Sequence, residues 1–419
     1  MNQPTGLLNK HVVPALTALS ENTYLSAIRA GMVSVVPLTI LGGLFIIVSF
    51  LPVAGWDKIV APYLQLLEVP VTATFGLLSV FVCFAIGYDL GKQLKQEAIV
   101  SATMATVVFL MIQLKLGETP EDIAFSMDSL GSKGLFTAVV IALVSVRVQK
   151  FFTDRNIVIK LPANVPAVVY ESFLSLSPLC FLVLVFWLIR FVLGVDIDHL
   201  VQTAFKPLVF ALNTLPGILS YAFLVTLLWS VGINGDNAMD AIVAPIFLQY
   251  LTANVEAMTA GQPLPYVTAY GFFTAFVNVG GTGATIALAL VMWNSREPGY
   301  RKVSRLSLPT QIFQINEPIF FGFPIVLNPV FMLPYVLNAL ILTASTYLLM
   351  QWGLIHKPFV NVPWTTPPII GHYLVSGGDW RAAVWGAISI VIAMLVYYPF
   401  AKAAERQRLK SEAARIASQ

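Results

Sequence analysis

The longest stretch of this chain with almost no charge sets the strongest limit on its fold. Residues 306–356 carry a single charged side chain, Glu317. A helix needs about 20 mostly apolar residues to cross a bilayer, so this stretch is too long for one crossing. A carboxylate at membrane depth costs roughly 2.5–3.5 kcal/mol on insertion scales, and Pro318 cannot donate a backbone hydrogen bond. We therefore expect a backbone break at Glu317, with its carboxylate facing water, a partner or a ligand.

The composition places the whole chain among membrane proteins. Hydrophobic residues make up 57% of its 419 residues and charged residues 11%, with a mean hydropathy of +0.79. A soluble chain would carry about twice that charged fraction. The net charge of +3 is too small and scattered to indicate nucleic-acid binding. Cys83 and Cys180 lie in apolar stretches without C-x-x-C spacing, so we expect both to be buried, without a metal or redox role.

Gaps in the charge pattern predict the membrane spans. Stretches of about one span cover residues 30–56, 69–88, 98–114, 134 to just past Arg147, 172–189, 207–235 and 382–401. Residues 241–255 form a shorter stretch, whereas 257–295 and 318–356 are too long for one crossing. Residues 358–378 are apolar but interrupted by Pro363, Pro367 and Pro368. The pattern therefore indicates regular spans in the first half and interrupted ones in the second.

The distribution of basic residues predicts which side each loop faces. Basic residues dominate the tail after Ala401, the loop 296–305 and the positions Lys92, Lys95, Arg147, Lys150, Arg155 and Lys160, so we expect these in the cytoplasm. Residues 115–133 carry more acidic than basic side chains, which favours the outside. Both termini in the cytoplasm and ten crossings satisfy these assignments if the segments around Asn316 and Pro367 are re-entrant hairpins. We predict an all-α polytopic membrane protein with about ten transmembrane helices and two re-entrant hairpins.

The polarity of the apolar stretches divides the chain near residue 200. Residues 1–200 have few polar side chains inside their spans, which is typical of a scaffold or an oligomer interface. Residues 201–402 collect Gly, Pro, Asn and acidic residues within apolar stretches, so we expect function there. Residues 403–419 form the expected cytoplasmic tail.

Four groups of polar and helix-breaking residues stand out in the second half. They are residues 229–237, 278–285, 316–318 and 362–372. Each has a structural interpretation beside the functional one. The first can be a solvated loop, the second a site of close helix packing, and the fourth an ordinary proline-rich loop. The third can hold an ion pair, although no basic residue lies near it in sequence.

The side chains in these groups predict a neutral, polyhydroxylated ligand. Amides and acids hydrogen-bond hydroxyl groups, and indole faces stack on the C–H face of a sugar ring. An ion pathway more often has several acids or His in series, and an anionic ligand would need Arg at depth. We therefore expect a sugar site. Its candidate residues are Glu317, Asn234, Asn316, Trp229, Trp364, Gly235 and Asn278.

The chain also carries motifs of a known family. They are Gly-Leu-Phe-Thr-Ala at 134–138, Ile-Lys-Leu-Pro-Ala-Asn-Val-Pro at 159–166, Gly-Gly-Thr-Gly-Ala-Thr at 280–285, Phe-Gln-Ile-Asn-Glu-Pro-Ile-Phe-Phe-Gly at 313–322, Asn-Pro at 328–329 and Pro-Trp-Thr at 363–365. Through them the chain resembles enzyme IIC, the membrane component of bacterial sugar phosphotransferase systems, in the lactose, cellobiose and diacetylchitobiose family. The resemblance covers nearly the whole chain.

The resemblance implies ten spanning helices, two re-entrant hairpins, a homodimer formed through the N-terminal half, and a C-terminal sugar site that moves as a rigid unit. It implies that Glu317 binds sugar hydroxyls near the C6 hydroxyl that becomes phosphorylated, and so holds the catalytic position. Trp229 and Trp364 would line the site. Asn234 departs from the family, because several members carry His in this Gly-Ile-x-Gly turn and Asn cannot titrate near neutral pH. Glu171 is also unusual, and the sequence assigns it no role.

The implied activity is import of a β-linked disaccharide, such as cellobiose, diacetylchitobiose or lactose, across the bacterial inner membrane. The four His residues are isolated and the tail is short, so we expect separate IIA and IIB chains to supply the phosphoryl group. The chain would then not be catalytic on its own, and we expect no metal or cofactor. A IIB chain could dock near the basic loop 296–305, although this loop can equally be an ordinary positive-inside anchor.

Two other classes of protein stay open on the sequence. An ion-coupled secondary sugar transporter could use Glu317 with Asp236 or Asp240 as coupling acids. A membrane-embedded transferase acting alone would need a metal-ligand or nucleophile motif, and H-E-x-x-H, D-x-D and paired-acid motifs are missing from the sequence. The residues and the resemblance together favour the phosphotransferase component.

Overall fold

The computed structural model describes most of the chain. It covers residues 22–50, 55–117, 123–125, 127–159, 167–323 and 325–417, without the side chains of Asp57, Asp128, 167–172 and 415–417. The predictions for the N-terminal residues 1–21, for positions 160–166 of the motif at 159–166 and for the side chain of Glu171 lie outside the described residues.

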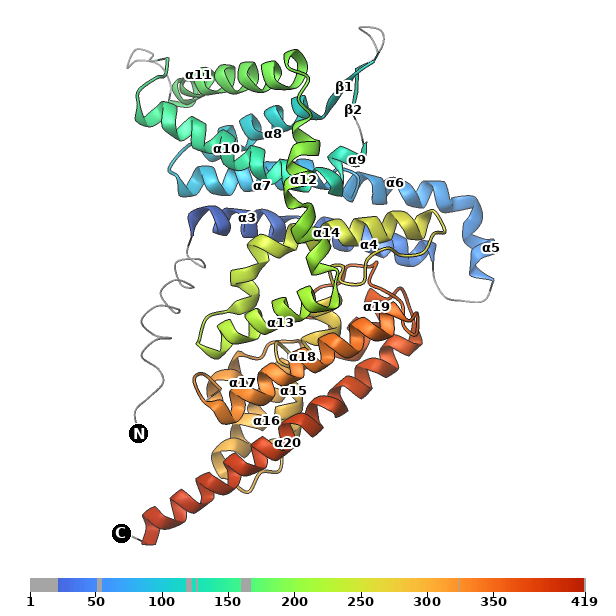
Figure 1. Cartoon of the computed structure of the whole chain (residues 1–419), viewed down its shortest axis with the longest axis vertical. Helices are drawn as coiled ribbons and strands as arrows, with labels where there is room; N and C mark the ends of the chain where they lie inside the picture. The colour runs from blue at the N-terminus through green and yellow to red at the C-terminus, as the bar shows by residue number, and fades with distance from the viewer. Residues whose placement is uncertain are drawn as a thin grey trace.

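The first half is helical apart from one short hairpin. Its elements are α3 (Thr23–Ser34), α4 (Val36–Ser49), α5 (Trp56–Val60), η2 (Ala61–Tyr63), α6 (Leu64–Thr74), α7 (Leu78–Gln93), α8 (Ala98–Gln113), β1 (Leu114–Leu116), β2 (Ile123–Phe125), α9 (Met127–Leu130), η3 (Ser132–Gly134), α10 (Leu135–Asp154), α11 (Ala167–Trp187) and η4 (Leu188–Val192). Strands β1 and β2 pair antiparallel. Helix α7 packs against α3, α8 and α10, which together form one end of the molecule (Figure 1).

The second half alternates long helices with short ones. Its elements are α12 (Ile197–Leu212), α13 (Leu215–Ser230), α14 (Gly235–Thr259), η5 (Phe272–Val277), α15 (Ile286–Met292), α16 (Pro298–Ile312), α17 (Glu317–Gly322), α18 (Pro329–Gln351), α19 (Pro368–Val375) and α20 (Trp380–Ala417). Helix α12 runs between the two ends of the molecule, and α13 and α15–α20 gather at the end opposite α11 (Figure 1). The division predicted near residue 200 falls inside α12, and as a functional boundary it stays a prediction.

Several helical segments are long and apolar enough to cross a membrane. In the described chain they cover Thr23–Ser49, Lys58–Gln93, Ser132–Asp154, Phe173–Val192, Gly235–Thr259, Pro329–Gln351 and Trp380–Ala414. Helices α12 and α13 form a further candidate only as a pair, and α8 is a shorter apolar helix. These helices agree with the predicted all-α membrane architecture. The number of ten crossings and the two re-entrant hairpins stay predictions.

The chain bends inside the span predicted over residues 207–235, which the sequence did not indicate. Helix α12 ends at Leu212, α13 begins at Leu215, and the two axes differ by 85°. Thr214 caps α13 by accepting the backbone N–H of Gly217 at 3.3 Å, and Pro216 occupies the first turn. The bend contains no charged residue, so the charge pattern of the sequence does not mark it.

The predicted break around Glu317 is confirmed. Helix α16 ends at Ile312, and the short α17 begins at Glu317. Gln314 between them has a φ of +67°, a conformation that a non-glycine residue adopts in turns. The long uncharged stretch before it is interrupted as well, since residues 257–295 hold only the short η5 and α15 after the end of α14.

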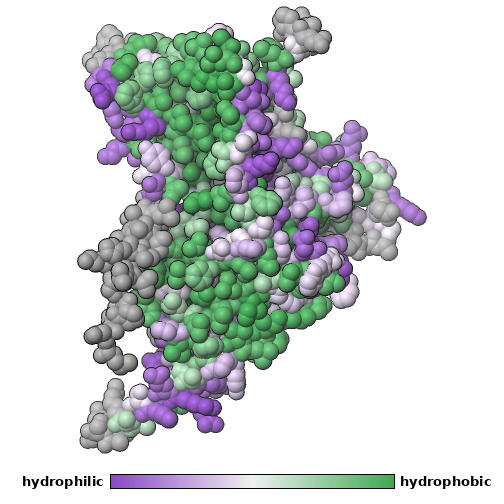
Figure 2. Space-filling model, viewed as in Figure 1, coloured by the Kyte–Doolittle hydropathy of each residue, from purple (hydrophilic) through white to green (hydrophobic). Residues whose placement is uncertain are grey.

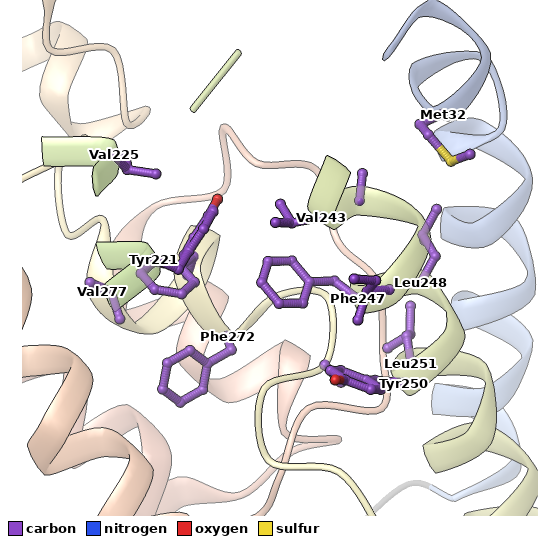
Figure 3. Packing of buried hydrophobic residues seen from close by; sticks show 14 of the residues in the cluster. Met32, Tyr221, Val225, Val243, Phe247, Leu248, Tyr250, Leu251, Phe272 and Val277 are labelled. Carbon is purple, nitrogen blue, oxygen red and sulfur yellow. The ribbon is translucent and has the colours of Figure 1, made fainter. Parts of the chain in front are cut away.

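Aromatic rings pack α14 against the other helices of the second half. Phe247 on α14 meets Tyr221 of α13 edge to face at 5.5 Å between ring centroids, and Phe273 of η5 lies 4.7 Å from the same Tyr221 ring. Figure 3 shows Tyr221 and Phe247 in the buried cluster that also contains Met32 of α3, the helix against which α14 packs. Helix α14 is therefore held between α3 and the rest of the second half.

The surface carries broad hydrophobic areas of the kind that lipid covers. Figure 2 shows them over α11 at one end and over α13, α18 and α20 at the other. On α11 the side chains of Phe181, Leu184 and Trp187 are exposed. Cys180 lies on this helix and is exposed too, so the prediction that both Cys are buried holds for Cys83 alone. The reason is that Cys180 lies on a helix with few packing partners, of whose span residues only 11% are buried in the chain itself.

Candidate functional site

The turn between α13 and α14 places the first polar group. Gly232 adopts a φ of +90° there, which allows the chain to reverse between the two helices. Asn234 caps α14, because its Oδ1 accepts the backbone N–H of Asn237 at 2.9 Å. A Cβ atom at Gly235 would lie 2.1 Å from the carbonyl oxygen of Val225. Gly235 therefore lets α13 and α14 approach closely, and the cap engages the Oδ1 atom of Asn234.

Asp236, in the first turn of α14, gathers three side chains from two parts of the sequence. Its Oδ2 accepts the indole N–H of Trp229 at 2.8 Å and the hydroxyl of Thr282 at 2.5 Å. Its Oδ1 accepts the amide of Asn278 at 3.3 Å. The sequence had suggested Asp236 only as a coupling acid of an ion-driven transporter. Its place directly after the Gly-Ile-Asn-Gly turn was the available signal that it belongs to the site.

A second acid lies one turn further along α14. Asp240 interacts electrostatically with Asp236 and with Arg29 of α3. The site is therefore connected by charge to a helix of the first half, in addition to the apolar packing between α14 and α3.

The second polar group is a Gly-rich turn held by side chains that flank Glu317. Gln314 Oε1 accepts the backbone N–H groups of Gly280 at 2.6 Å and Gly281 at 3.0 Å. Asn316, which is 4% exposed, donates from Nδ2 to the carbonyl oxygen of Thr282 at 3.0 Å. The segments around residues 280 and 316, about 35 residues apart in sequence, thus form one hydrogen-bonded unit with the Asp236 group.

Glu317 begins α17 with an accessible carboxylate. The side chain is exposed, and within the part of the chain that the structure describes it has no hydrogen-bond or ion-pair partner. Helix α17 is fastened to α13, since the ring of buried Phe320 meets the Trp229 indole edge to face at 5.0 Å. The structural ion pair considered from the sequence is thus not formed among the described residues. Glu317 keeps its full hydrogen-bonding capacity.

The fourth group lies on a loop braced by the first half. Asn361 Nδ2 donates to Thr39 Oγ1 of α4 at 2.6 Å, and both residues are buried. Three residues later, Trp364 is 55% exposed. Among the described residues, the Trp364 indole forms no ring contact or hydrogen bond with Trp229 or Asn316. The structure therefore joins Trp229, Asn278 and Asn316 through hydrogen bonds around Asp236, with Asn234, Gly235 and Glu317 next to them in sequence, whereas the place of Trp364 in the site stays a prediction.

Asn254 clamps the loop that leads to Trp364. Its Nδ2 donates to the carbonyl oxygens of Tyr266 and Pro358, each at 2.7 Å, and its Oδ1 accepts the N–H of Tyr266 at 2.9 Å. Asn254→Ala leaves these buried backbone groups without partners, so we expect the free energy of unfolding to fall by about 2 kcal/mol or more. Denaturant unfolding of the purified protein in detergent measures this. Asn237→Ala, which removes an exposed amide from the same helix, should unfold like the wild type, and equal stability of the two variants would contradict the clamp.

Comparison with known proteins places this site in a family. The family model described as "Phosphotransferase system, EIIC" matches residues 29–339. The lichenan permease IIC component of Bacillus subtilis is 33% identical over 98% of this chain and 96% of its own. The cellobiose-specific EIIC component of Geobacillus stearothermophilus is 34% identical over 97% and 96%.

A solved structure shows the same fold. The transporter ChbC, the IIC component of an N,N'-diacetylchitobiose-specific phosphotransferase system, matches with a TM-score of 0.90. It is 32% identical and the match covers 97% of this chain and 99% of that one. The predicted all-α membrane architecture is thereby confirmed. The chain belongs to the EIIC family, the sugar-transporting membrane components of phosphotransferase systems.

Proposed function

We propose that this EIIC protein imports a β-linked disaccharide, with cellobiose as the first candidate and diacetylchitobiose and lactose as the next. The sugar is phosphorylated during import by a separate IIB chain, which receives its phosphoryl group from IIA. Two features support this. The lichenan and cellobiose relatives act on β-linked glucans or glucosides by name, and both match this chain over nearly their full length as IIC components.

The single observation that carries the proposal is the accessible carboxylate of Glu317. It begins a short helix inside an apolar stretch and lies beside Asn316, which the Gly-rich turn holds in place. A carboxylate at such depth is costly unless it serves a ligand. Sugar hydroxyls donate hydrogen bonds to a carboxylate without bringing a charge of their own. We expect Asn234 and Asn278 to supply further amides for the same ligand, and Trp229, which is 6% exposed, to line the site.

The Glu317 carboxylate also favours transport in one direction, into the cytoplasm. Sugar binds from the outside, the C-terminal half turns inward, and the C6 hydroxyl held near Glu317 accepts a phosphoryl group from IIB on the cytoplasmic side. The product then carries a phosphate dianion beside the Glu317 carboxylate. Their repulsion in a site of low dielectric favours release of the sugar phosphate into the cytoplasm. Phosphorylation thus makes transport one-way without an ion gradient. An ion-coupled transporter that uses Asp236 or Asp240 would need such a gradient.

The proposed assembly is a homodimer in the bacterial inner membrane. Residues 1–200 form the dimer contact and residues 201–402 carry the sugar, with both termini and the tail from residue 403 in the cytoplasm. The broad apolar face of α11 supports a lipid or dimer contact at the N-terminal half. The basic segment 296–305, most of which forms the start of α16, is the proposed docking region for IIB, since Arg301, Lys302 and Arg305 are exposed on that helix.

A binding panel on the purified protein tests the substrate class. We expect binding of cellobiose, lactose, diacetylchitobiose or gentiobiose, with cellobiose preferred, and at least tenfold weaker binding of maltose as the α-linked control. Isothermal titration measures this, because a misplaced hydroxyl leaves polar groups of the site unpaired. Equal affinity for maltose and cellobiose, or binding of none of these sugars, would overturn the proposal.

A further inference from the structure

Asp236 is the point at which the polar groups of the site meet, and its three partners are all donors. The indole N–H of Trp229, the hydroxyl of Thr282 and the amide of Asn278 all end on this one carboxylate. An ionised carboxylate can only accept hydrogen bonds. Each partner must therefore turn its donor toward Asp236, whatever ligand is bound.

This constraint determines what the partners offer to a ligand. Trp229 has its only N–H bound to Asp236, so its buried indole keeps no donor for a ligand. Asn278 points its amide nitrogen at Asp236, which leaves its carbonyl Oδ1 as a hydrogen-bond acceptor. No described residue donates to that oxygen, and it is not among the buried side-chain atoms without a partner. Oδ1 of Asn278 is therefore free to accept from a ligand.

Asp236 also orients Asn316, the residue beside Glu317, through Thr282. The hydroxyl of Thr282 is bound to Asp236, and its carbonyl oxygen accepts the amide nitrogen of Asn316. Oδ1 of Asn316 accepts no hydrogen bond from the described residues either. The site thus presents acceptors, namely two amide oxygens and the Glu317 carboxylate, and Asp236 orients the two amides directly or through Thr282.

The position of Asp236 at a helix N-terminus suits its carboxylate to accept these three hydrogen bonds. It lies in the first turn of α14, where the positive end of the helix dipole stabilises an acid. The three donors and the helix end together stabilise the carboxylate.

We propose that Asp236 is a positioning residue that sets specificity: it fixes Asn278 as an acceptor, so that the site selects sugars with a hydroxyl donor at that point. This role rests on the proposed sugar function. A purely structural staple between α13, α14 and the Gly-rich turn would instead lower the affinity for every sugar by the same factor.

The first test needs no sugar. In protein labelled with 15N-tryptophan, the Trp229 indole resonance is assigned from its loss in Trp229→Phe. Asp236→Asn should shift that resonance, because the carboxylate acceptor is replaced by an amide. Asn237→Ala, the neighbouring exposed position, should not shift it. An unchanged indole resonance in Asp236→Asn would show that the carboxylate does not hold Trp229 and would overturn the network.

The second test uses cellobiose analogues in which one hydroxyl at a time is replaced by fluorine, which accepts weakly and cannot donate. In the wild type, at least one analogue should bind at least tenfold more weakly than cellobiose. In Asp236→Asn the Asn278 amide can rotate and offer its N–H, so cellobiose should bind about tenfold more weakly than to the wild type. The loss of affinity caused by fluorine at that hydroxyl should then fall below threefold. If Asp236→Asn does not fold, Asn278→Ala should abolish the same loss of affinity by removing the acceptor.

The outcomes separate the two claims. If Asp236→Asn shows the same loss of affinity as the wild type for every fluorinated analogue, the specificity role is overturned and sugar transport is left intact. If Asp236→Asn does not fold, the same result in Asn278→Ala leads to the same conclusion. Wild-type protein that binds neither cellobiose nor any other sugar of the panel would overturn the proposed function and this role with it.

Discussion

Glu317→Gln is expected to weaken disaccharide binding about 10- to 100-fold. Gln has nearly the shape of Glu, but it loses the charge and replaces one acceptor oxygen with a donor nitrogen. Hydrogen bonds to a charged group contribute roughly 1.5–3 kcal/mol, which corresponds to this range of affinities. Because the described chain offers Glu317 no partner of its own, the loss should fall on ligand binding and leave the stability of the protein unchanged. Isothermal titration and thermal unfolding measure the two quantities.

The same variant should also retain its product. Without the carboxylate, the sugar phosphate no longer meets a negative charge, so we expect it to inhibit Glu317→Gln more strongly than the wild type. Glu68→Gln, an exposed carboxylate on α6, is the matched control and should behave as the wild type in both assays. Full sugar affinity together with full phosphorylation in Glu317→Gln would remove Glu317 from the proposed mechanism.

Gly281→Ala is expected to weaken sugar binding at least tenfold by displacing Asn316. Gly281 has a φ of +103°, and a Cβ atom there would lie 2.4 Å from Cβ and 2.5 Å from Cγ of Asn316. The backbone strain costs about 1–2 kcal/mol, and the overlap forces Asn316 and the start of α17 to move as well. We expect a loss of affinity of at least tenfold and a fall of at least about 2 kcal/mol in the free energy of unfolding.

A second glycine isolates the backbone contribution. Gly261 has a φ of +65°, and a Cβ atom there would meet nothing within 4 Å. Gly261→Ala should therefore cost only the conformational strain, about 1 kcal/mol, and keep full sugar affinity. If Gly281→Ala bound sugar as tightly as Gly261→Ala, the close contact between the Gly-rich turn and Asn316 would not support the site.

The fold was predictable where charge and helix breakers mark it. Glu317 and Pro318 interrupt the uncharged stretch 306–356, and α17 begins at that point. The bend between α12 and α13 was missed because Thr214 and Pro216 cap a new helix within an uncharged stretch. The exposure of Cys180 could not be predicted either, since an apolar sequence does not tell whether neighbouring helices or lipid cover a helix face.

The site was predictable as a list of residues, although its geometry was not. The sequence indicated Asn278, Asn316 and Glu317 as polar residues in apolar surroundings, and the structure places the first two in one hydrogen-bonded unit beside the third. It could not indicate which side chains Asp236 binds, because its partners Asn278 and Thr282 lie more than 40 residues away. The position of Trp364 relative to this unit likewise depends on tertiary packing.

Uptake by sealed proteoliposomes tests the central claim most directly. The purified chain is reconstituted and supplied, inside the vesicles, with phosphoenolpyruvate and the soluble phosphotransferase proteins including IIA and IIB; labelled cellobiose is added outside. We predict accumulation of the sugar as its phosphate, dependent on the phosphoryl donor and unaffected by ionophores that dissipate proton and sodium gradients. Accumulation of unmodified sugar that is driven by an ion gradient, without any phosphoryl donor, would contradict the account.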